Sequence, residues 1–247
     1  MSVSDFYKKG NHQPEMHKDI LKEEFVYQLD FWKSSELIEL AKMIGLKEGA
    51  RVLDIGSGWG GPLVLFAERY GIIGEGVDLS ENNVEIARKH AIERGVEDKV
   101  NFCLCDAEKY DTPQKFDFII MIDSFVHIKD KKRVLKKCNE MLADDGKILI
   151  AVECANEGIS DAEINKRNML GAVYTEYVEE YLSNFKEQGF YVEYCKEYIG
   201  KRSEFAQKAL AWMDENHFSS KDSMQMIYDL DFERKVSEWI FVLKKKN

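Results

Sequence analysis

A short apolar strand that runs directly into a cluster of glycines constrains the fold of this chain more than any other feature. The predicted strand Arg51–Ile55 is followed by Gly-Ser-Gly-Trp-Gly-Gly at 56–61 and then by Pro62, which begins a predicted helix. Glycine lets a backbone turn sharply and approach a ligand closely, and the first turn of a helix offers unpaired N–H groups. The segment therefore predicts a strand, loop and helix that hold a nucleotide-like ligand.

Short strands alternate with helices from this loop onwards. Strands are expected at 51–55, 72–78, 100–105, 116–122 and 147–152. Helices between them are expected at 61–70, 81–94 and 130–142. This alternation is typical of parallel βαβ units with right-handed crossovers. We therefore predict an α/β fold with a Rossmann-like, doubly wound sheet, whose ligand binds at the C-terminal ends of the strands.

The segments on either side of this core break the alternation. Residues 15–44 place apolar side chains at helical spacing and predict one or two helices, whereas 154–171 is polar and is expected to be irregular. Later helices are expected at 175–188 and 202–230, and later strands at 191–198 and 235–243. The last strand is expected to be an antiparallel edge strand, so the predicted sheet is seven-stranded and mostly parallel.

These patterns divide the chain into three parts. Residues 1–45 are expected to form N-terminal helices that act as a lid. Residues 46–200 are expected to form the Rossmann-like core, which includes a second lid segment at 155–172. Residues 201–247 are expected to form a helical insertion and the last strand. Lids of this kind exclude water from an active site and complete it.

Charge and composition disfavour several classes of function. The formal net charge of -10 argues against a nucleic-acid partner, because nucleic acids select basic surfaces. No apolar run approaches the roughly 18 residues of a membrane span, and the N-terminus has no apolar signal region, so a cytoplasmic protein without a membrane partner is expected. The five cysteines form no C-x-x-C pair, which indicates neither a disulfide framework nor a metal site. The sequence leaves the oligomeric state open.

Acidic side chains at the strand ends narrow the choice of ligand. Asp78 ends the next strand, 22 residues after Gly56, where a carboxylate can accept hydrogen bonds from ribose hydroxyls. The glycines also fit the dinucleotide pattern G-x-G-x-x-G, so an NAD enzyme is an alternative. Asp54, two residues before the first glycine, favours a cationic amino acid moiety over a pyrophosphate. Asp106 ends the third strand, where it can meet an adenine amino group.

Five segments resemble, in order and spacing, the consecutive motifs of the class I S-adenosylmethionine-dependent methyltransferases. They are VLDIGSGWGG at 52–61, GVDLS at 76–80, CDA at 105–107, FDFIIMIDSFVHI at 116–128 and MLADDGKILI at 141–150. Asp123 and His127, together with VSEWIFVLKKK at 236–246, are similar to the phosphoethanolamine and sarcosine/dimethylglycine N-methyltransferases. The resemblance implies an enzyme that uses S-adenosylmethionine to methylate a small molecule, with an amine nitrogen as the favoured acceptor.

The same resemblance implies which residues bind the cofactor. The methionine part is assigned to Asp54, Gly56, Ser57 and Gly58. The ribose is assigned to Asp78 and Leu79, and the adenine to Asp106 and Ala107.

Methyl transfer to an amine needs a group that removes or redirects a proton, because a protonated nitrogen cannot attack. Imidazole suits that task near neutral pH, so His127 is the candidate base. Asp123, four residues earlier, can attract an ammonium or orient the histidine. In the small-amine enzymes an N-terminal tyrosine pairs with the equivalent histidine, and Tyr7 is assigned to that role, with Tyr27 as the alternative.

The expected substrate pocket departs from the phosphobase pattern of tyrosines and basic residues. The alignment of motifs places Glu153 after the fifth strand and Tyr228 ahead of the last one, which disfavours a phosphate-bearing substrate. Tyr174, Tyr177 and Trp212 are expected to form an aromatic cage for an amine, with Glu153 as its counter-charge. Two alternatives stay open: an O- or C-methyltransferase acting on a phenol, quinone or lipid, and a non-catalytic protein that binds S-adenosylmethionine.

Overall fold

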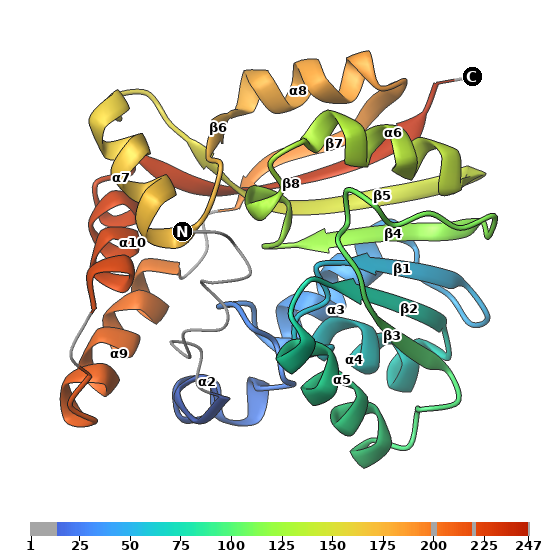
Figure 1. Cartoon of the computed structure of the whole chain (residues 1–247), viewed down its shortest axis with the longest axis horizontal. Helices are drawn as coiled ribbons and strands as arrows, with labels where there is room; N and C mark the ends of the chain where they lie inside the picture. Colours follow the sequence, from blue (N-terminus) through green and yellow to red (C-terminus); the bar gives the residue numbers. More distant parts are fainter. Residues whose placement is uncertain (1–13, 199–201, 219–220, 247) are drawn as a thin grey trace.

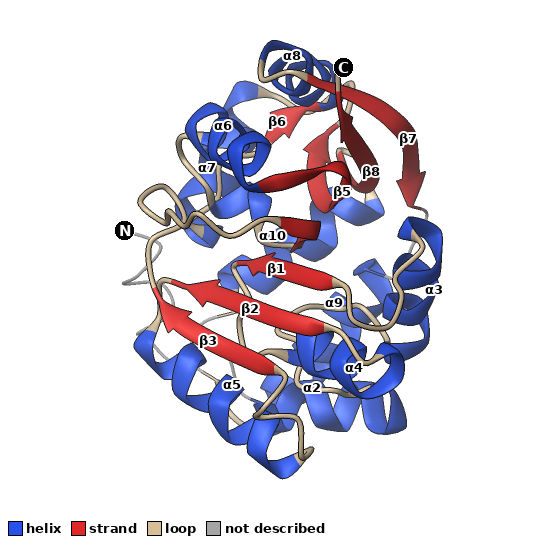
Figure 2. Cartoon of the chain, turned by 90° about the vertical axis from the view of Figure 1, so that its right-hand side faces the viewer, coloured by secondary structure: helices blue, strands red, loops and turns tan. Residues whose placement is uncertain are grey.

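Helices cover both faces of one central sheet in the computed structural model of the chain, as Figures 1 and 2 show. The structure describes residues 14–198, 202–218 and 221–246. The strands are β1 (Arg51–Ile55), β2 (Ile73–Asp78), β3 (Val100–Leu104), β4 (Phe116–Ile122), β5 (Leu142–Ala155), β6 (Glu176–Tyr177), β7 (Phe190–Tyr198) and β8 (Val236–Lys245). In this part of the chain the strand order is β3-β2-β1-β4-β5-β8-β7, and β6 pairs with β5.

The α-helices of the described residues fall into two groups. Those of the core are α3 (Ser34–Ile44), α4 (Gly61–Tyr70), α5 (Glu81–Glu93), α6 (Lys131–Met141) and α8 (Val178–Glu187). The others are α2 (Pro14–Leu21), α7 (Asp161–Gly171), α9 (Arg202–Glu215) and α10 (Asp222–Phe232). In the described ranges, no helix combines the length and the apolar character that crossing a membrane requires.

The core is divided by the sheet into two apolar layers. Side chains of α3, α4 and α5 pack on one face, where Leu37, Leu63 and Phe66 are fully buried. Those of α6 and α8 pack on the other face, with Leu135 and Phe185 at the centre. Parallel pairing of β1 with both β2 and β4, and the helices on both faces, confirm the predicted doubly wound α/β fold.

β8 differs from the expected edge strand, although its antiparallel direction is confirmed. It lies between β5 and β7 and pairs antiparallel with both, so β7 forms the edge. Nearly all residues of β8 from Val236 to Leu243 are buried on both sides of the sheet, as expected for an internal strand and not for an edge strand. Two neighbouring glutamates, Glu153 of β5 and Glu238 of β8, lie opposite each other in register.

The segment predicted to be irregular at 154–171 contains α7, so that prediction was wrong. Its capping box is the local cause: the Ser160 side chain accepts from the backbone N–H of Glu163, and the Glu163 carboxylate accepts from the N–H of Ser160. The helix carries few apolar residues, so its periodicity is weak in the sequence. The capping pattern S-x-x-E was the available signal.

Candidate active site

The loop between β1 and α4 lies at the point where the strand order reverses, between β1 and β4. Gly56 has φ of 75°, and a Cβ at this position would lie 2.5 Å from the Cβ of Ser124, which follows β4. The Ser124 hydroxyl donates to the carbonyl of Ile55 and ties the two strand ends together. Glycine is therefore required here by both backbone conformation and space. A crevice at this switch point is where open α/β sheets bind their ligands.

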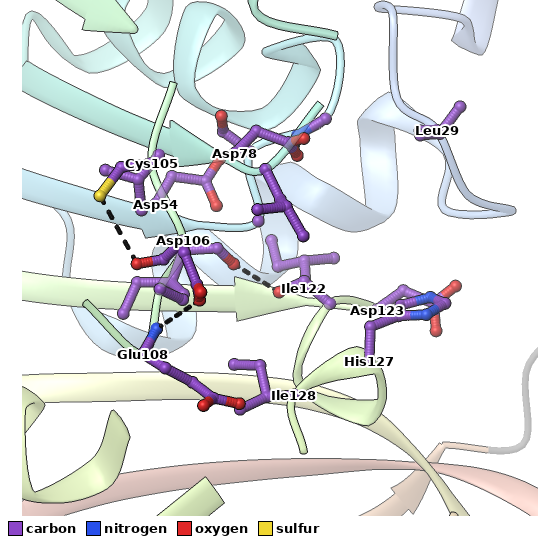
Figure 3. A pocket seen from close by; sticks show the side chains of 18 of the residues that line it. Leu29, Asp54, Asp78, Cys105, Asp106, Glu108, Ile122, Asp123, His127 and Ile128 are labelled. Atoms are coloured by element: carbon purple, nitrogen blue, oxygen red, sulfur yellow. Dashed lines mark hydrogen bonds between the residues drawn. The ribbon is translucent and has the colours of Figure 1, made fainter. Parts of the chain in front are cut away.

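A cavity of about 290 Å³ opens at these strand ends (Figure 3). All eight residues assigned to the cofactor line it, together with Asp123, His127 and Tyr174. Figure 3 shows Asp54 and Asp78 on one side of the cavity, Asp106 and Glu108 on another, and Asp123 beside His127 at a third. The fold thus brings acids from the ends of β1, β2 and β4 and from the loop after β3 to one space.

Asp54 is the most deeply buried of these acids. It is 3% exposed, and its Oδ2 atom has no hydrogen-bond partner among the described residues; the same holds for the Ser57 hydroxyl. Burial, and then the neighbouring Asp78 carboxylate, raise the pKa of Asp54 to about 8. Buried polar atoms are nearly always paired in native proteins, so this corner fits a polar, cationic ligand group.

Asp78 is held by the loop that it faces. Its carboxylate accepts hydrogen bonds from the backbone N–H of Gly58 at 2.9 Å and of Ser80 at 2.8 Å. Burial raises the pKa of Asp78, and these hydrogen bonds oppose the rise. Asp106 is fixed in a similar way, because it accepts from the N–H of Glu108 and forms an ion pair with Lys109 at 3.1 Å. Both carboxylates are therefore oriented before any ligand arrives.

His127, on the short helix η2 (Phe125–His127), also lines the cavity. Its Nδ1 is 3.0 Å from the carbonyl oxygen of Ala172. Because a carbonyl can only accept, we assign the proton to Nδ1 and the acceptor lone pair to Nε2. Burial lowers the pKa of His127 to about 4, so the ring is neutral at physiological pH. Ala172, the residue after α7, therefore sets the tautomer.

A second cavity of about 290 Å³ adjoins the first and shares Leu29, Asp30, Asp123 and His127 with it. Asp30 was not identified from the sequence. The one available indication was an acidic residue between two apolar ones, Leu29 and Phe31. The segment 26–28 passes so close to the start of α4 that a Cβ at Gly61 would lie 2.6 Å from its backbone. This close approach brings Asp30 to the boundary of the two cavities.

The two shared carboxylates are electrostatically coupled. Burial, followed by the Asp123 charge, raises the pKa of Asp30 well above its usual value. Burial likewise raises the pKa of Asp123 to about 6, and the Arg202 guanidinium limits the rise. Asp30 accepts one hydrogen bond, from the N–H of Trp32, whereas no described residue donates a hydrogen bond to the Asp123 carboxylate. A cation placed between them would favour the charged form of both.

Glu153 does not lie along either cavity, contrary to its assignment as a substrate counter-charge. It is fully buried, and its carboxylate accepts from Arg167 at 3.0 Å, from Thr175 at 2.9 Å and from Arg202. Burial opposes its charged form, but Arg167 and then Arg202 outweigh burial and hold the pKa of Glu153 at about 2. The two arginines, not Glu153, line the second cavity. Arg167 and Arg202 gave no local signal in the sequence.

The predicted aromatic cage of Tyr174, Tyr177 and Trp212 is not assembled, and Tyr228 does not line a cavity either. Tyr174 lines the first cavity, with its ring centroid 5.7 Å from the Lys131 ammonium. Tyr177 pairs with β5, and Tyr228 stacks on Phe232 at 5.6 Å, and both lie outside the two cavities. Trp212 is also absent from the lining and donates to Asp19 at 2.8 Å. The helical spacing of these aromatics reflects packing instead.

The two N-terminal tyrosines have different outcomes. Tyr7 lies outside the described residues. The Tyr27 ring stacks on that of His90, with 4.2 Å between the ring centroids, and its hydroxyl donates to Glu93. Tyr27 therefore packs against α5 and lines neither cavity.

Comparison with known proteins identifies the family. The model of a family described as a methyltransferase domain matches residues 46–228. The chain belongs to the methyltransferase domain family. The predicted methyltransferase class is therefore confirmed at the level of this family. A structural neighbour, phosphoethanolamine N-methyltransferase 2 of Haemonchus contortus, was solved in complex with S-adenosyl-L-methionine.

The relatives of this methyltransferase include proteins named phosphoethanolamine N-methyltransferases. Phosphoethanolamine N-methyltransferase 3 of Arabidopsis thaliana is 37% identical over 47% of this chain and 24% of its own length. The chain thus spans about a quarter of that curated relative. Curated O-methyltransferases are also among the relatives, so the family does not fix the acceptor atom.

Solved structures share the fold. Phosphoethanolamine N-methyltransferase 2 of Haemonchus contortus, in complex with phosphomonomethylethanolamine and S-adenosylhomocysteine, superposes with a TM-score of 0.83 at 21% identity, over 100% of this chain and 61% of that one. A protein of Galdieria sulphuraria described as a sarcosine dimethylglycine methyltransferase gives a TM-score of 0.81 at 16% identity, over 94% and 98%.

Proposed function

We propose that this methyltransferase transfers the methyl group of S-adenosylmethionine to the nitrogen of a small cationic amine. The observation that carries the proposal is the pair of carboxylates, Asp30 and Asp123, at the boundary of the two cavities. A methyl donor in the first cavity and an acceptor in the second would meet at this boundary. Two acids that face the meeting point favour a cation there over a neutral phenol or an anion.

The first cavity provides matching groups for the cofactor. Asp54 and Ser57 would hold its ammonium and carboxylate end, Asp78 its ribose and Asp106 its adenine. When bound, S-adenosylmethionine supplies a methyl group that is activated by a sulfonium. The protein then contributes mainly by aligning the acceptor nitrogen and by excluding water, because displacement needs the reacting atoms about 3 to 3.5 Å apart.

The amine must lose a proton before its nitrogen can attack. The Asp123 carboxylate attracts the ammonium, and His127 lies beside it at the boundary of the two cavities. With pKa values of about 6 for Asp123 and about 4 for His127, Asp123 is the stronger proton acceptor of the two. His127 therefore acts with Asp123 in proton removal, rather than as an isolated base.

Asparagine variants of the two acids test the proposal. Asp30→Asn and Asp123→Asn remove a charge and keep the shape, so each should raise KM for an amine acceptor about tenfold or more, given ~1.5–3 kcal/mol for a charge-assisted contact. Asp229→Asn is the matched control: Asp229 is exposed on α10, and its substitution should leave KM unchanged. The wild-type KM should also rise below about pH 6, where Asp123 becomes neutral.

Two results would contradict the proposal. One is an unchanged KM for amines in both variants, with affinity for S-adenosylhomocysteine intact. The other is methylation of phenols, with no amine methylated, in a panel that offers both.

A further inference from the structure

The second cavity has a wall made of methionines. Met16 of α2, Met169 of α7, Met213 of α9 and Met224 of α10 all line it, so four different helices each contribute one. Phe205 and Ile227 extend this wall. Methionine side chains are flexible and polarizable, and they adapt to hydrocarbon groups of varied shape. This apolar wall has no role in the methyl transfer described above.

Each arginine and lysine that lines the same cavity has a carboxylate partner. However, Arg167 and Arg202 share one, Glu153, and Nη1 of Arg202 makes no hydrogen bond within the described residues. Arg167 pairs with Glu153 at 3.0 Å, and Arg202 pairs with Glu153 and lies 3.5 Å from Glu238. Lys221 pairs with Asp214. A phosphate or carboxylate on the acceptor would have to compete with these partners, and the Asp123 carboxylate would repel it. The lining therefore combines paired cations, the carboxylates of Asp30 and Asp123 at one end, and the methionine wall, with His17, Asp222 and Ser223 as further polar members.

We propose that the acceptor is an amine that carries an alkyl or aryl group, rather than an amine that carries a phosphate or a carboxylate. Its nitrogen lies between Asp30 and Asp123, and its hydrocarbon part packs against the methionine wall. This inference rests on the proposed function, because it takes the second cavity as the acceptor site. It makes Met213 and Met224 specificity-determining residues.

A series of straight-chain primary amines from ethylamine to hexylamine tests the inference on the wild-type enzyme. Each added methylene that enters the cavity should raise kcat/KM about fourfold, which corresponds to ~0.8 kcal/mol per buried CH₂. Phosphoethanolamine and sarcosine, which carry a phosphate and a carboxylate, serve as the comparisons and should be poorer acceptors than butylamine.

A variant that fills part of the second cavity tests whether the dependence on chain length arises there. Met224→Trp should lower kcat/KM for hexylamine at least tenfold while it leaves ethylamine within twofold. Gln225→Trp is the matched control, because Gln225 is the exposed neighbour on α10 and is not part of the lining. This control should show the wild-type dependence on chain length.

The outcomes separate the two proposals. If kcat/KM does not depend on chain length, or if phosphoethanolamine or sarcosine is the best acceptor, the inference is overturned while amine methylation stands. If no amine is methylated and phenols are, the proposed function fails and the inference fails with it. The inference is supported if kcat/KM rises with chain length in the wild type and in Gln225→Trp, and if Met224→Trp loses this rise for the longer amines.

Discussion

At the scale of single residues, the active site contains carboxylates whose burial or backbone conformation is energetically unfavourable. Asp54 is buried without a partner for one oxygen, and Asp123 has φ of 54°, in the left-handed region. Such a conformation costs a non-glycine residue on the order of 1–3 kcal/mol, and it persists only where the surroundings enforce it. Here the N–H of Asp123 donates to the carbonyl of Ala151 at 2.9 Å, which fixes the turn after β4. These residues are therefore placed for a ligand and not for stability.

Cofactor binding should depend on pH through Asp54. With its pKa near 8, this carboxyl is protonated at neutral pH in the free protein, yet it must be charged to pair with the ammonium of the cofactor. Affinity for S-adenosylhomocysteine should therefore rise with pH between 6 and 8, by up to about tenfold per pH unit, with release of a proton. Calorimetry in two buffers of different ionisation enthalpy measures that proton directly.

Asp54→Asn supplies the control for this linkage. The folded pKa of Asp54 lies above its unfolded value, so its contribution to stability is fully present below pH 4 and is lost as pH rises through about 8. The variant should therefore unfold at a higher temperature than the wild type at pH 8.5, and bind the cofactor weakly at every pH. Wild-type binding that is independent of pH and releases no proton would contradict the role given to Asp54.

At the scale of elements, one buried ion network ties two helices to the sheet. Glu153 of β5 binds Arg167 of α7 and Arg202 of α9, and Glu238 of β8 lies within reach of Arg202. Burial and the Asp123 charge raise the pKa of Glu238 well above its usual value. The network thus holds the walls of the second cavity in place, and Glu153 is its central anion.

Glu153→Gln should therefore act on stability before it acts on substrate binding. It leaves two buried guanidinium groups without their main counter-charge, which costs about 3–5 kcal/mol in comparable buried pairs. Glu193→Gln is the matched control: Glu193 pairs with Lys147 and Lys244 on the surface, where ion pairs contribute only ~0–1 kcal/mol. Denaturant unfolding of both variants makes the comparison. A stable Glu153→Gln enzyme with a raised KM alone would restore Glu153 as the substrate counter-charge.

The elements also show what the sequence can and cannot predict. The bounds of β1, α4 and β4 follow from local patterns. The residues assigned to the cofactor line one cavity because each lies at, or just after, the C-terminal end of a parallel strand. The arginine partners of Glu153 come from α7 and α9, which follow β5 in the sequence. No local sequence pattern predicts that these helices pack beside β5. Asp30 was missed for the same reason, because its position depends on how 26–30 crosses α4.

At the scale of the whole molecule, we propose that a cap of α2, α9 and α10 covers the second cavity beside a rigid core. α9 packs on α2 and α10, and α10 packs on α7 (Figure 1). The apolar cluster between α2 and α9 is small, with Met16, Ala209 and Met213 as its buried members, whereas the core layers on the sheet are extensive. Elements with few buried apolar contacts open at lower free energy than a central sheet. The cap is therefore the part of the enzyme from which we expect the acceptor to enter.

Hydrogen exchange should resolve this division. In the free enzyme, amides of α9 and α10 should exchange faster than those of β1 and β4, because the cap opens without global unfolding. S-adenosylhomocysteine should slow exchange at 56–61 and 26–30, which border the first cavity, whereas an added amine acceptor should slow α9 and α10. The amides of α6, on the opposite face of the sheet, are the internal control. Their exchange should slow only by the amount that the acceptor adds to the stability of the whole protein. If α9 and α10 exchange as slowly as β4 in the free enzyme, the cap is part of the rigid core, and the acceptor must enter by another route.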